Sequence, residues 1–104
     1  MTMNTVAGFE WDSGNWHKCQ KHGVSIEAIE NLFARPVAIL PDEAHSQKER
    51  RFRAIGWTEQ GRAVFVVFTL RIQGEETLIR PISARYMHGK EIKSYEKENP
   101  DLQE

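Results

Sequence analysis

The amino-acid sequence predicts an α+β protein. Two observations indicate this class: residues 24–33 carry apolar side chains at helical spacing, whereas runs between Val37 and Tyr86 have the two-residue period of strands. Strands that follow one another without intervening helices favour an antiparallel sheet with the helices segregated from it. The expected fold is therefore an antiparallel sheet of about four strands, with two N-terminal helices packed on one face and a C-terminal helix.

The length and composition indicate one domain, 1–104, with a modest core. Residues 1–8 are expected to form a flexible N-terminus and residues 97–104 an acidic C-terminal tail. No run approaches the roughly 18 apolar residues of a membrane span, and MTMNTVAG does not resemble a secretory signal. The single cysteine, Cys19, excludes an internal disulfide and fits a reducing compartment, so a cytoplasmic location is expected.

The first elements are expected between Phe9 and His22. The stretch FEWD, Phe9 to Asp12, alternates aromatic and acidic residues and predicts a short first strand. A helix capped by Asp12 or Ser13 is expected to follow and to end at His22, with Gly23 in the C′ position.

Within this first helix, Trp16 and Cys19 are three residues apart. Side chains at this spacing lie on the same side of a helix, so both are expected to face the core. Cys19 is then a packing thiol and a poor candidate for a nucleophile.

A second helix is predicted after Ser25, which is a favourable N-cap, and Glu27 in its first turn complements the helix dipole. Arg35-Pro36 ends the helix because a residue before proline avoids the helical region. The apolar stripe expected to enter the core consists of Ile26, Ile29, Leu32 and Phe33.

Four strands are expected after Pro36: Val37–Leu40, Arg51–Trp57, Arg62–Ile72 and a last one that begins near Leu78. The third run is apolar on both faces, as in a central strand. A polar loop, Pro41–Glu49, separates the first two, and a last helix is expected from about His88 to Asn99.

Two strands carry features that bear on function. Phe52 and Ala54 point to one face of their strand, so Arg51, Arg53 and Ile55 point to the other and make it partly cationic. Pro81 cannot donate a ladder hydrogen bond, which predicts either a sheet edge or a bulge in the last strand.

The net charge of −1 argues against a protein that coats nucleic acid. The basic residues are nevertheless clustered, and the clusters could bind phosphate, remain solvated or form cross-strand ion pairs with Glu75 or Glu76. They are Lys48, Arg50, Arg51 and Arg53, and then Arg80 and Arg85.

The segment HKCQKHG, His17 to Gly23, holds two histidines and one thiol. A zinc site is not expected, because structural sites use four ligands and the other histidines, His45 and His88, lie far along the chain. His22 is expected in the last helical turn, where it could serve either as a capping charge or as a catalytic imidazole.

Arg85, Tyr86 and His88 are expected where the last strand leads into the last helix. A guanidinium, a phenol and an imidazole can together deprotonate a ribose 2′-hydroxyl, neutralise a phosphorane and protonate the leaving oxygen. The alternative is an Arg–Glu and Tyr–backbone network that docks the last helix. Regular alternation would put Arg80 and Arg85 on opposite faces, but a bulge at Pro81 could bring them together.

The order of motifs resembles the BrnT-type toxins of type II toxin–antitoxin systems, over Phe9 to Tyr95. The motifs are FEWD, KHGVS, PDEAHS, ERRFRAIGW, GRAVFVVFTLR and IRPISARYMHGKEIKSYE. The resemblance implies a RelE-like fold and a metal-independent endoribonuclease that inhibits translation and needs no cofactor. It also implies a BrnA-type ribbon-helix-helix antitoxin as partner, which would make the DNA contacts. The positions that match the family pattern and can carry chemistry are Lys21, His22, Arg53 and Arg85.

The resulting hypothesis has Arg53 and Arg85 hold the scissile phosphate and His22 or His88 act as general acid or base. The residues expected to contact RNA beside them are Lys21, Arg51, Arg80 and Tyr86. One alternative is a RelE-like module, or a diverged inactive toxin, that binds a partner without catalysis. Nucleic-acid binding without chemistry is a weaker alternative, which the near-neutral charge disfavours.

Overall fold

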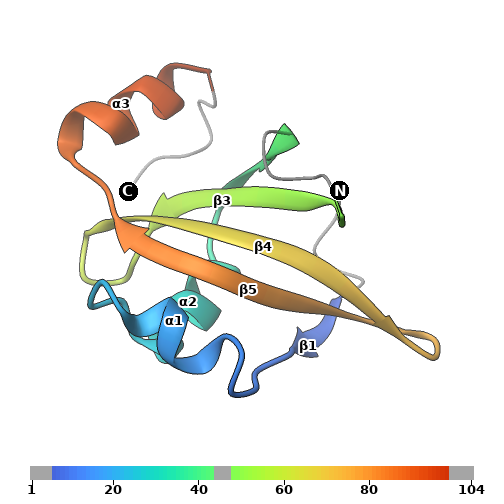
Figure 1. The fold of residues 1–104 in the computed structure, drawn as a ribbon. Helices are drawn as coiled ribbons and strands as arrows, with labels where there is room; N and C mark the ends of the chain where they lie inside the picture. The colour runs from blue at the N-terminus through green and yellow to red at the C-terminus, as the bar shows by residue number, and fades with distance from the viewer. Residues whose placement is uncertain (1–5, 44–47, 99–104) are drawn as a thin grey trace.

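The computed structural model describes residues 6–43 and 48–98, and in them it is an α+β fold with five strands and three helices (Figure 1). In chain order the elements are β1 (Val6–Phe9), α1 (Trp16–Gln20), α2 (Ile26–Leu32), β2 (Val37–Pro41), β3 (Arg51–Trp57), β4 (Ala63–Gln73), β5 (Glu76–Tyr86) and α3 (Gly89–Glu98). The helices among these residues are too short or too polar to cross a bilayer.

The sheet has the order β1-β5-β4-β3-β2. Its strands β2 to β5 are antiparallel, as expected, and β4 lies between two neighbours. The sheet is mixed rather than purely antiparallel, because β1 adds a fifth strand parallel to β5. This short strand comes from Val6–Phe9 rather than from Phe9–Asp12, and it includes residues 6–8, which were expected to be flexible.

The chain leaves the sheet just after β1, where the Glu10 amide donates to the Ile79 carbonyl at 2.8 Å. The alternation of aromatic and acidic residues in FEWD therefore does not reflect a strand. It reflects the different contacts that these side chains make. Trp11 packs against the core and its indole Nε1 donates to Glu30 at 2.8 Å, whereas Glu10 and Asp12 bind Arg80.

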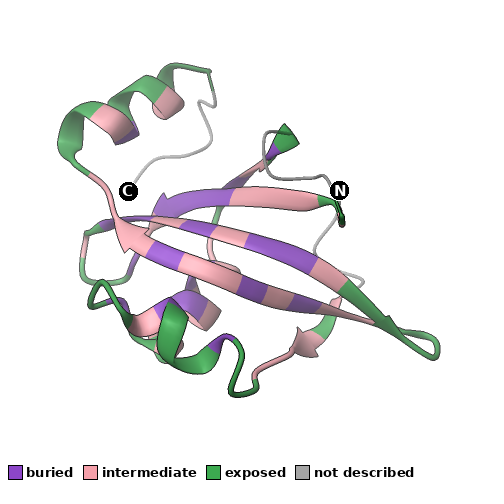
Figure 2. Cartoon of the chain, in the orientation of Figure 1, coloured by how far each residue is buried: buried purple, intermediate pink, exposed green. Residues whose placement is uncertain are grey.

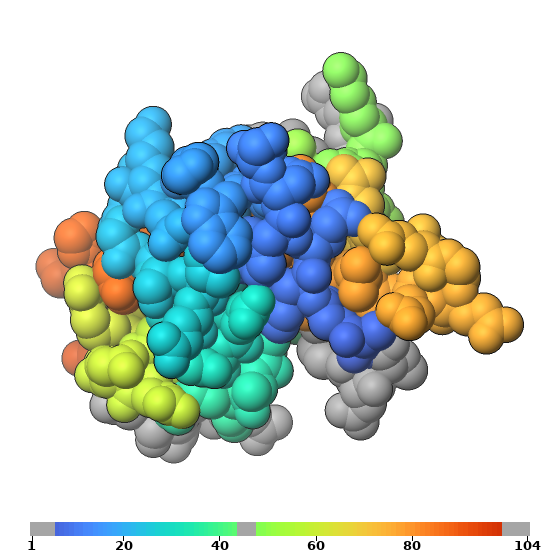
Figure 3. Space-filling model, turned by 90° about the horizontal axis from the view of Figure 1, so that it is seen from below, coloured from blue at the N-terminus to red at the C-terminus, as the bar shows by residue number. Residues whose placement is uncertain are grey.

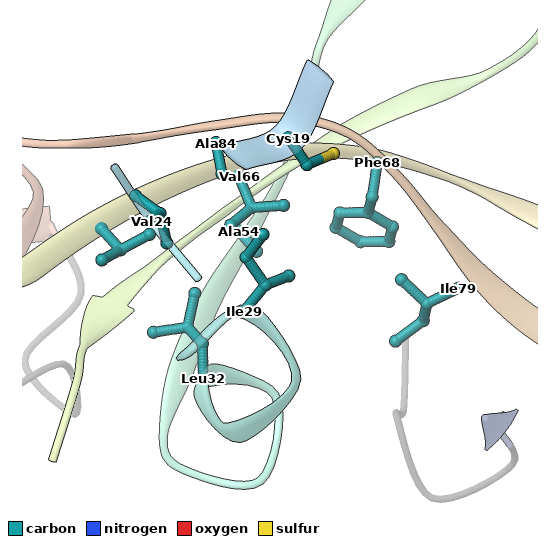
Figure 4. Close-up of a cluster of buried hydrophobic side chains, with 10 residues drawn as sticks. Cys19, Val24, Ile29, Leu32, Ala54, Val66, Phe68, Ile79 and Ala84 are labelled. Carbon is teal, nitrogen blue, oxygen red and sulfur yellow. The ribbon is translucent and has the colours of Figure 1, made fainter. Parts of the chain in front are cut away.

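The main core lies between the sheet and the first two helices. Buried positions alternate with half-buried ones along the middle of β4 and β5 (Figure 2). The helices α1 and α2 cover this face (Figure 3). The close-up in Figure 4 shows Cys19, Val24, Ile29 and Leu32 from the helical side meeting sheet residues. Those sheet residues are Ala54, Val66, Phe68, Ile79 and Ala84.

Helix α2 begins as its sequence predicts. The Ser25 hydroxyl accepts a hydrogen bond from the Ala28 amide at 3.0 Å, which confirms the N-cap. Ile29 and Leu32 are fully buried. Before the helix, Gly23 has φ +89°, a value that favours glycine. The preceding helix ends at Gln20, two residues before the expected end at His22, and a turn joins it to Gly23.

Helix α1 differs from the prediction, because Cys19 is fully buried while Trp16 is 42% exposed. Five residues bury only a narrow strip, and Trp16 lies beside that strip with its ring edge-on to Trp11 at 5.8 Å. Asn15 attaches the helix to the sheet: its side-chain amide donates to the carbonyls of Glu10 and Pro81 at 3.0 and 2.8 Å.

A second, smaller cluster lies on the opposite side of the sheet. Ile92 of α3 is 1% exposed and packs with Ile55 and Ala63. Phe65 and Tyr95 pack around this cluster, so α3 covers one end of the sheet face that α1 and α2 leave open (Figure 1).

Candidate functional site

The sheet face opposite α1 and α2 is called here the arginine face, after Arg51 and Arg53 of β3 and Arg80 and Arg85 of β5. The strand register arranges them in three rows across β4: Arg51, Thr69 and Arg80; Arg53, Val67 and Ser83; Ile55, Phe65 and Arg85. The expected bulge is present, because the register shifts between Val67 and Phe68. It brings Arg80 and Arg85 to the same face.

A pocket of about 480 Å³ opens on the arginine face. Arg51 and Arg53 line one side of it, and Lys18 reaches it from α1. The other lining residues are Asp42, Phe65, Val67, Ile82 and Ser83. Sequence reasoning did not single out Lys18 or Ser83. The parity of Ser83 with Arg85 in ISAR could have indicated Ser83, whereas no local pattern indicates Lys18.

Arg53 is held loosely by protein groups. Its Nη2 donates to the Pro41 carbonyl at 3.3 Å and its Nη1 to the Tyr95 hydroxyl at 3.5 Å. Both distances are long for hydrogen bonds. Nε of Arg53 is buried and has no hydrogen-bond partner within the described part of the chain. Its guanidinium therefore keeps donors for an anion. Arg51, beside it, also lies 3.9 Å from Glu49 through Nη2.

Arg85 makes the contact that the helix-docking alternative predicts. Its Nη1 and Nη2 donate to the two carboxylate oxygens of Glu91 at 3.0 and 3.1 Å. Its guanidinium also lies 4.6 Å from the ring centre of Phe65, a residue of the pocket wall. Arg85 and Arg53 are two strands apart and offset by two residues, so their Cα atoms are roughly 12 Å apart.

The Glu91 carboxylate is held in its ionised form. The hydrogen bonds that Glu91 accepts from Arg85 lower the pKa of its carboxyl group below the ordinary value. The hydrogen bond from the His88 amide, at 3.3 Å, makes a smaller contribution in the same direction. The charge of His88 acts in the same direction. His88 is exposed and directly precedes α3, so the structure brings His88, Glu91 and Arg85 together.

Arg80 lies on the arginine face but is engaged by two carboxylates. Its Nη1 donates to Glu10 at 3.0 Å and to Asp12 at 2.9 Å, and its Nη2 donates to Asp12 at 3.1 Å. The hydrogen bonds from Arg80 lower the pKa of Asp12, and Asp12 in turn raises the pKa of Arg80. Arg80 is thus placed to hold the segment after β1 against the sheet.

Tyr86 points to the other face from Arg85, as neighbours in a strand do. The Arg62 guanidinium lies 3.4 Å from its ring centre, and both residues line a polar pocket of about 340 Å³ beside α2. The sheet therefore separates Tyr86 from Arg53 and Arg85.

Lys21 and His22 are exposed at the end of α1 and do not line the pocket on the arginine face. Burial raises the pKa of the Cys19 thiol to about 11, in agreement with a packing role. His45 lies outside the described residues. Within residues 6–43 and 48–98, no group of three or more His, Cys, Asp or Glu side chains is placed to hold a metal ion.

Comparison with known proteins gives one family. Residues 11–91 match the family described as the ribonuclease toxin BrnT of type II toxin–antitoxin systems. No curated protein matches the chain.

Proposed function

Because this chain belongs to the BrnT family of ribonuclease toxins of type II toxin–antitoxin systems, we propose that it is an endoribonuclease whose arginine face binds and cleaves RNA. One observation carries this proposal: Arg51, Arg53 and Lys18 converge on a single pocket of about 480 Å³. The forked donors of a guanidinium match the geometry of phosphate oxygens. Contacts to phosphates supply most of the affinity of proteins for nucleic acid.

In the proposed mechanism Arg53 and Arg85 hold the scissile phosphate, and Arg51 and Lys18 add positive charge. These groups would be placed to neutralise the charge that develops on the phosphorane. An imidazole would move the proton, and His88 is favoured over His22 because the His88 amide binds Glu91, the carboxylate that also holds Arg85. Since arginines and a lysine supply the charge, cleavage is expected without a divalent metal.

The other residues expected to contact RNA lie away from the pocket on the arginine face, so we propose different roles for them. Arg80 is proposed to support the site through its ion pairs rather than to bind RNA. Lys21 and His22 could contact RNA that runs over α1, and Tyr86 could stack on a base only where RNA passes around the end of the sheet.

The cellular setting follows from the family. We propose that the protein acts in the cytoplasm, inhibits translation by cleaving RNA, and is neutralised by a BrnA-type ribbon-helix-helix antitoxin that makes the DNA contacts of the pair. We also propose that the fold is RelE-like, which the antiparallel strands β2 to β5 support.

The test is cleavage of single-stranded RNA by the purified protein in EDTA. The wild-type protein should cleave, and Arg85→Ala should lose most of the activity. Arg62→Ala is the matched control, because Arg62 is an exposed arginine beside Tyr86 on the opposite face. If the wild-type protein and Arg85→Ala leave the RNA equally intact, the proposal that this protein is an endoribonuclease is refuted.

A second function has one observation in its favour. The two-pronged contact of Arg85 with Glu91 is what a non-catalytic module would use to dock its last helix. Such a module would bind the antitoxin without cleaving RNA and without arresting growth when expressed. The enzyme is favoured over the binding module if expression of the wild-type protein arrests growth and expression of Arg85→Ala does not, while both proteins still bind the antitoxin.

A further inference from the structure

The carboxylate of Glu91 lies in the first turn of α3, at the end of the arginine face. Its Oε1 and Oε2 accept from Arg85 at 3.0 and 3.1 Å, and Oε1 also accepts from the His88 amide at 3.3 Å. The Glu91 carboxylate thus holds the Arg85 guanidinium of β5 and the backbone amide of His88, the residue directly before α3.

This group borders the pocket on the arginine face. The Arg85 guanidinium lies 4.6 Å from the ring centre of Phe65, and Phe65 lines the pocket. One helical turn beyond Glu91, the Tyr95 hydroxyl lies 3.5 Å from Nη1 of Arg53. The turn of α3 that carries Glu91 therefore lies between the two arginines that would hold the phosphate.

Docking of α3 does not require the ion pair. Ile92 is 1% exposed and anchors the helix on Ile55 and Ala63. The side chains of Arg85 and Glu91 are 43% and 35% exposed, and ion pairs so accessible to water contribute little to stability. The same exposure leaves the carboxylate open to a bound substrate.

We propose that Glu91 is the general base of the RNA cleavage described above, an inference that rests on the proposed function. The Glu91 carboxylate takes the proton of the 2′-hydroxyl, the 2′-oxygen forms a bond to phosphorus, and the bond from phosphorus to the 5′-oxygen breaks. The His88 imidazolium gives its proton to that 5′-oxygen. The products are a 2′,3′-cyclic phosphate and a 5′-hydroxyl, and Arg85 binds the phosphoryl oxygens throughout.

The hydrogen bonds from Arg85 and from the His88 amide keep the Glu91 carboxylate ionised, which is the form that can accept a proton. The charged groups that face it among the described residues are Arg85 from β5 and His88 before α3. Both are cationic when charged, and Phe65 of β4 adds only an apolar wall.

The test compares Glu91→Gln with Glu91→Asp, using a control on the same helix, Glu98→Gln, whose carboxylate is exposed. Two RNA substrates are used, one with the natural 5′-oxygen and one with sulfur in its place. A thiolate leaves without being protonated, because a thiol has a pKa of about 8.5, so only the general acid becomes dispensable. Thermal melts check that each variant is folded.

Glu91→Gln should lower the cleavage rate about 100- to 10,000-fold on both substrates, with RNA affinity nearly unchanged. Glu91→Asp should restore part of the rate, and Glu98→Gln should match the wild type. The loss in His88→Gln should be recovered on the sulfur substrate.

Two outcomes would overturn the assignment. If folded Glu91→Gln cleaves within about threefold of wild type, Glu91 only docks the helix. If its loss is recovered with sulfur, Glu91 acts on the leaving group instead. A third outcome would refute the proposed function itself: the wild-type protein would cleave neither substrate. This result differs from the two outcomes above, and it would also refute the assignment of Glu91 as the general base.

Discussion

Replacing Arg53 by alanine should separate catalysis from stability. The guanidinium lies in the wall of the pocket on the arginine face, and its two hydrogen bonds to protein, at 3.3 and 3.5 Å, are both long. Loss of such contacts should lower the free energy of unfolding by no more than about 1 kcal/mol. The structural cost is therefore small.

The catalytic cost should be much larger. A group that stabilises developing charge in a transition state typically contributes about 3–4 kcal/mol, which corresponds to roughly 100- to 1,000-fold in rate. Arg53→Lys keeps the charge but loses the forked geometry, so its rate should lie between those of wild type and Arg53→Ala.

The assay is single-turnover cleavage of RNA in EDTA with protein in excess, together with thermal melts of each variant. Arg62→Ala, on the opposite face, controls for the loss of one positive charge. The reasoning is refuted if Arg53→Ala cleaves within about threefold of wild type, or if Arg62→Ala loses as much activity. It is equally refuted if Arg53→Ala melts so early that unfolding accounts for the lost activity.

Three further predictions concern stability. Leu32→Ala removes a fully buried side chain and should lower the free energy of unfolding by about 2–5 kcal/mol in urea titrations, whereas Ile72→Ala, at a position 78% exposed, should change it little. Gly23→Ala places a side chain at φ +89° and should cost about 1–2 kcal/mol; an unchanged melting temperature would contradict this. Because hydrogen bonds from Arg80 lower the pKa of Asp12, their stabilisation should be present above about pH 4 and be lost as pH falls through the lowered value. Melts from pH 7 to pH 2 should therefore show a smaller acid-dependent loss in Asp12→Asn than in wild type.

Local sequence patterns predicted several features well. The Ser25 cap and the buried Ile29 and Leu32 follow from contacts within a few residues, which the sequence displays directly. The alternation in β3 likewise placed Arg51 and Arg53 on one face, because the two-residue period is a property of any extended strand.

Other features depend on partners far along the chain. Trp16 was expected in the core with Cys19, but helical spacing does not say which arc of a five-residue helix meets the sheet. The parallel pairing of β1 with β5 joins residues about 70 positions apart and has no local signal. The ion pairs of Arg80 with Glu10 and Asp12 also join distant segments and have no local signal.

The sequence by itself determined the α+β class, the start of α2, and which side chains of β3 share a face, because all of these follow from local spacing and capping. It also indicated the family through its ordered motifs, and residues 11–91 match that family. Only the tertiary structure decided that Lys18 joins Arg53 at one pocket, that Tyr86 lies on the opposite face, and that Glu91 holds Arg85. These outcomes depend on strand order and helix docking, which are set by burial of the whole chain rather than by any short segment.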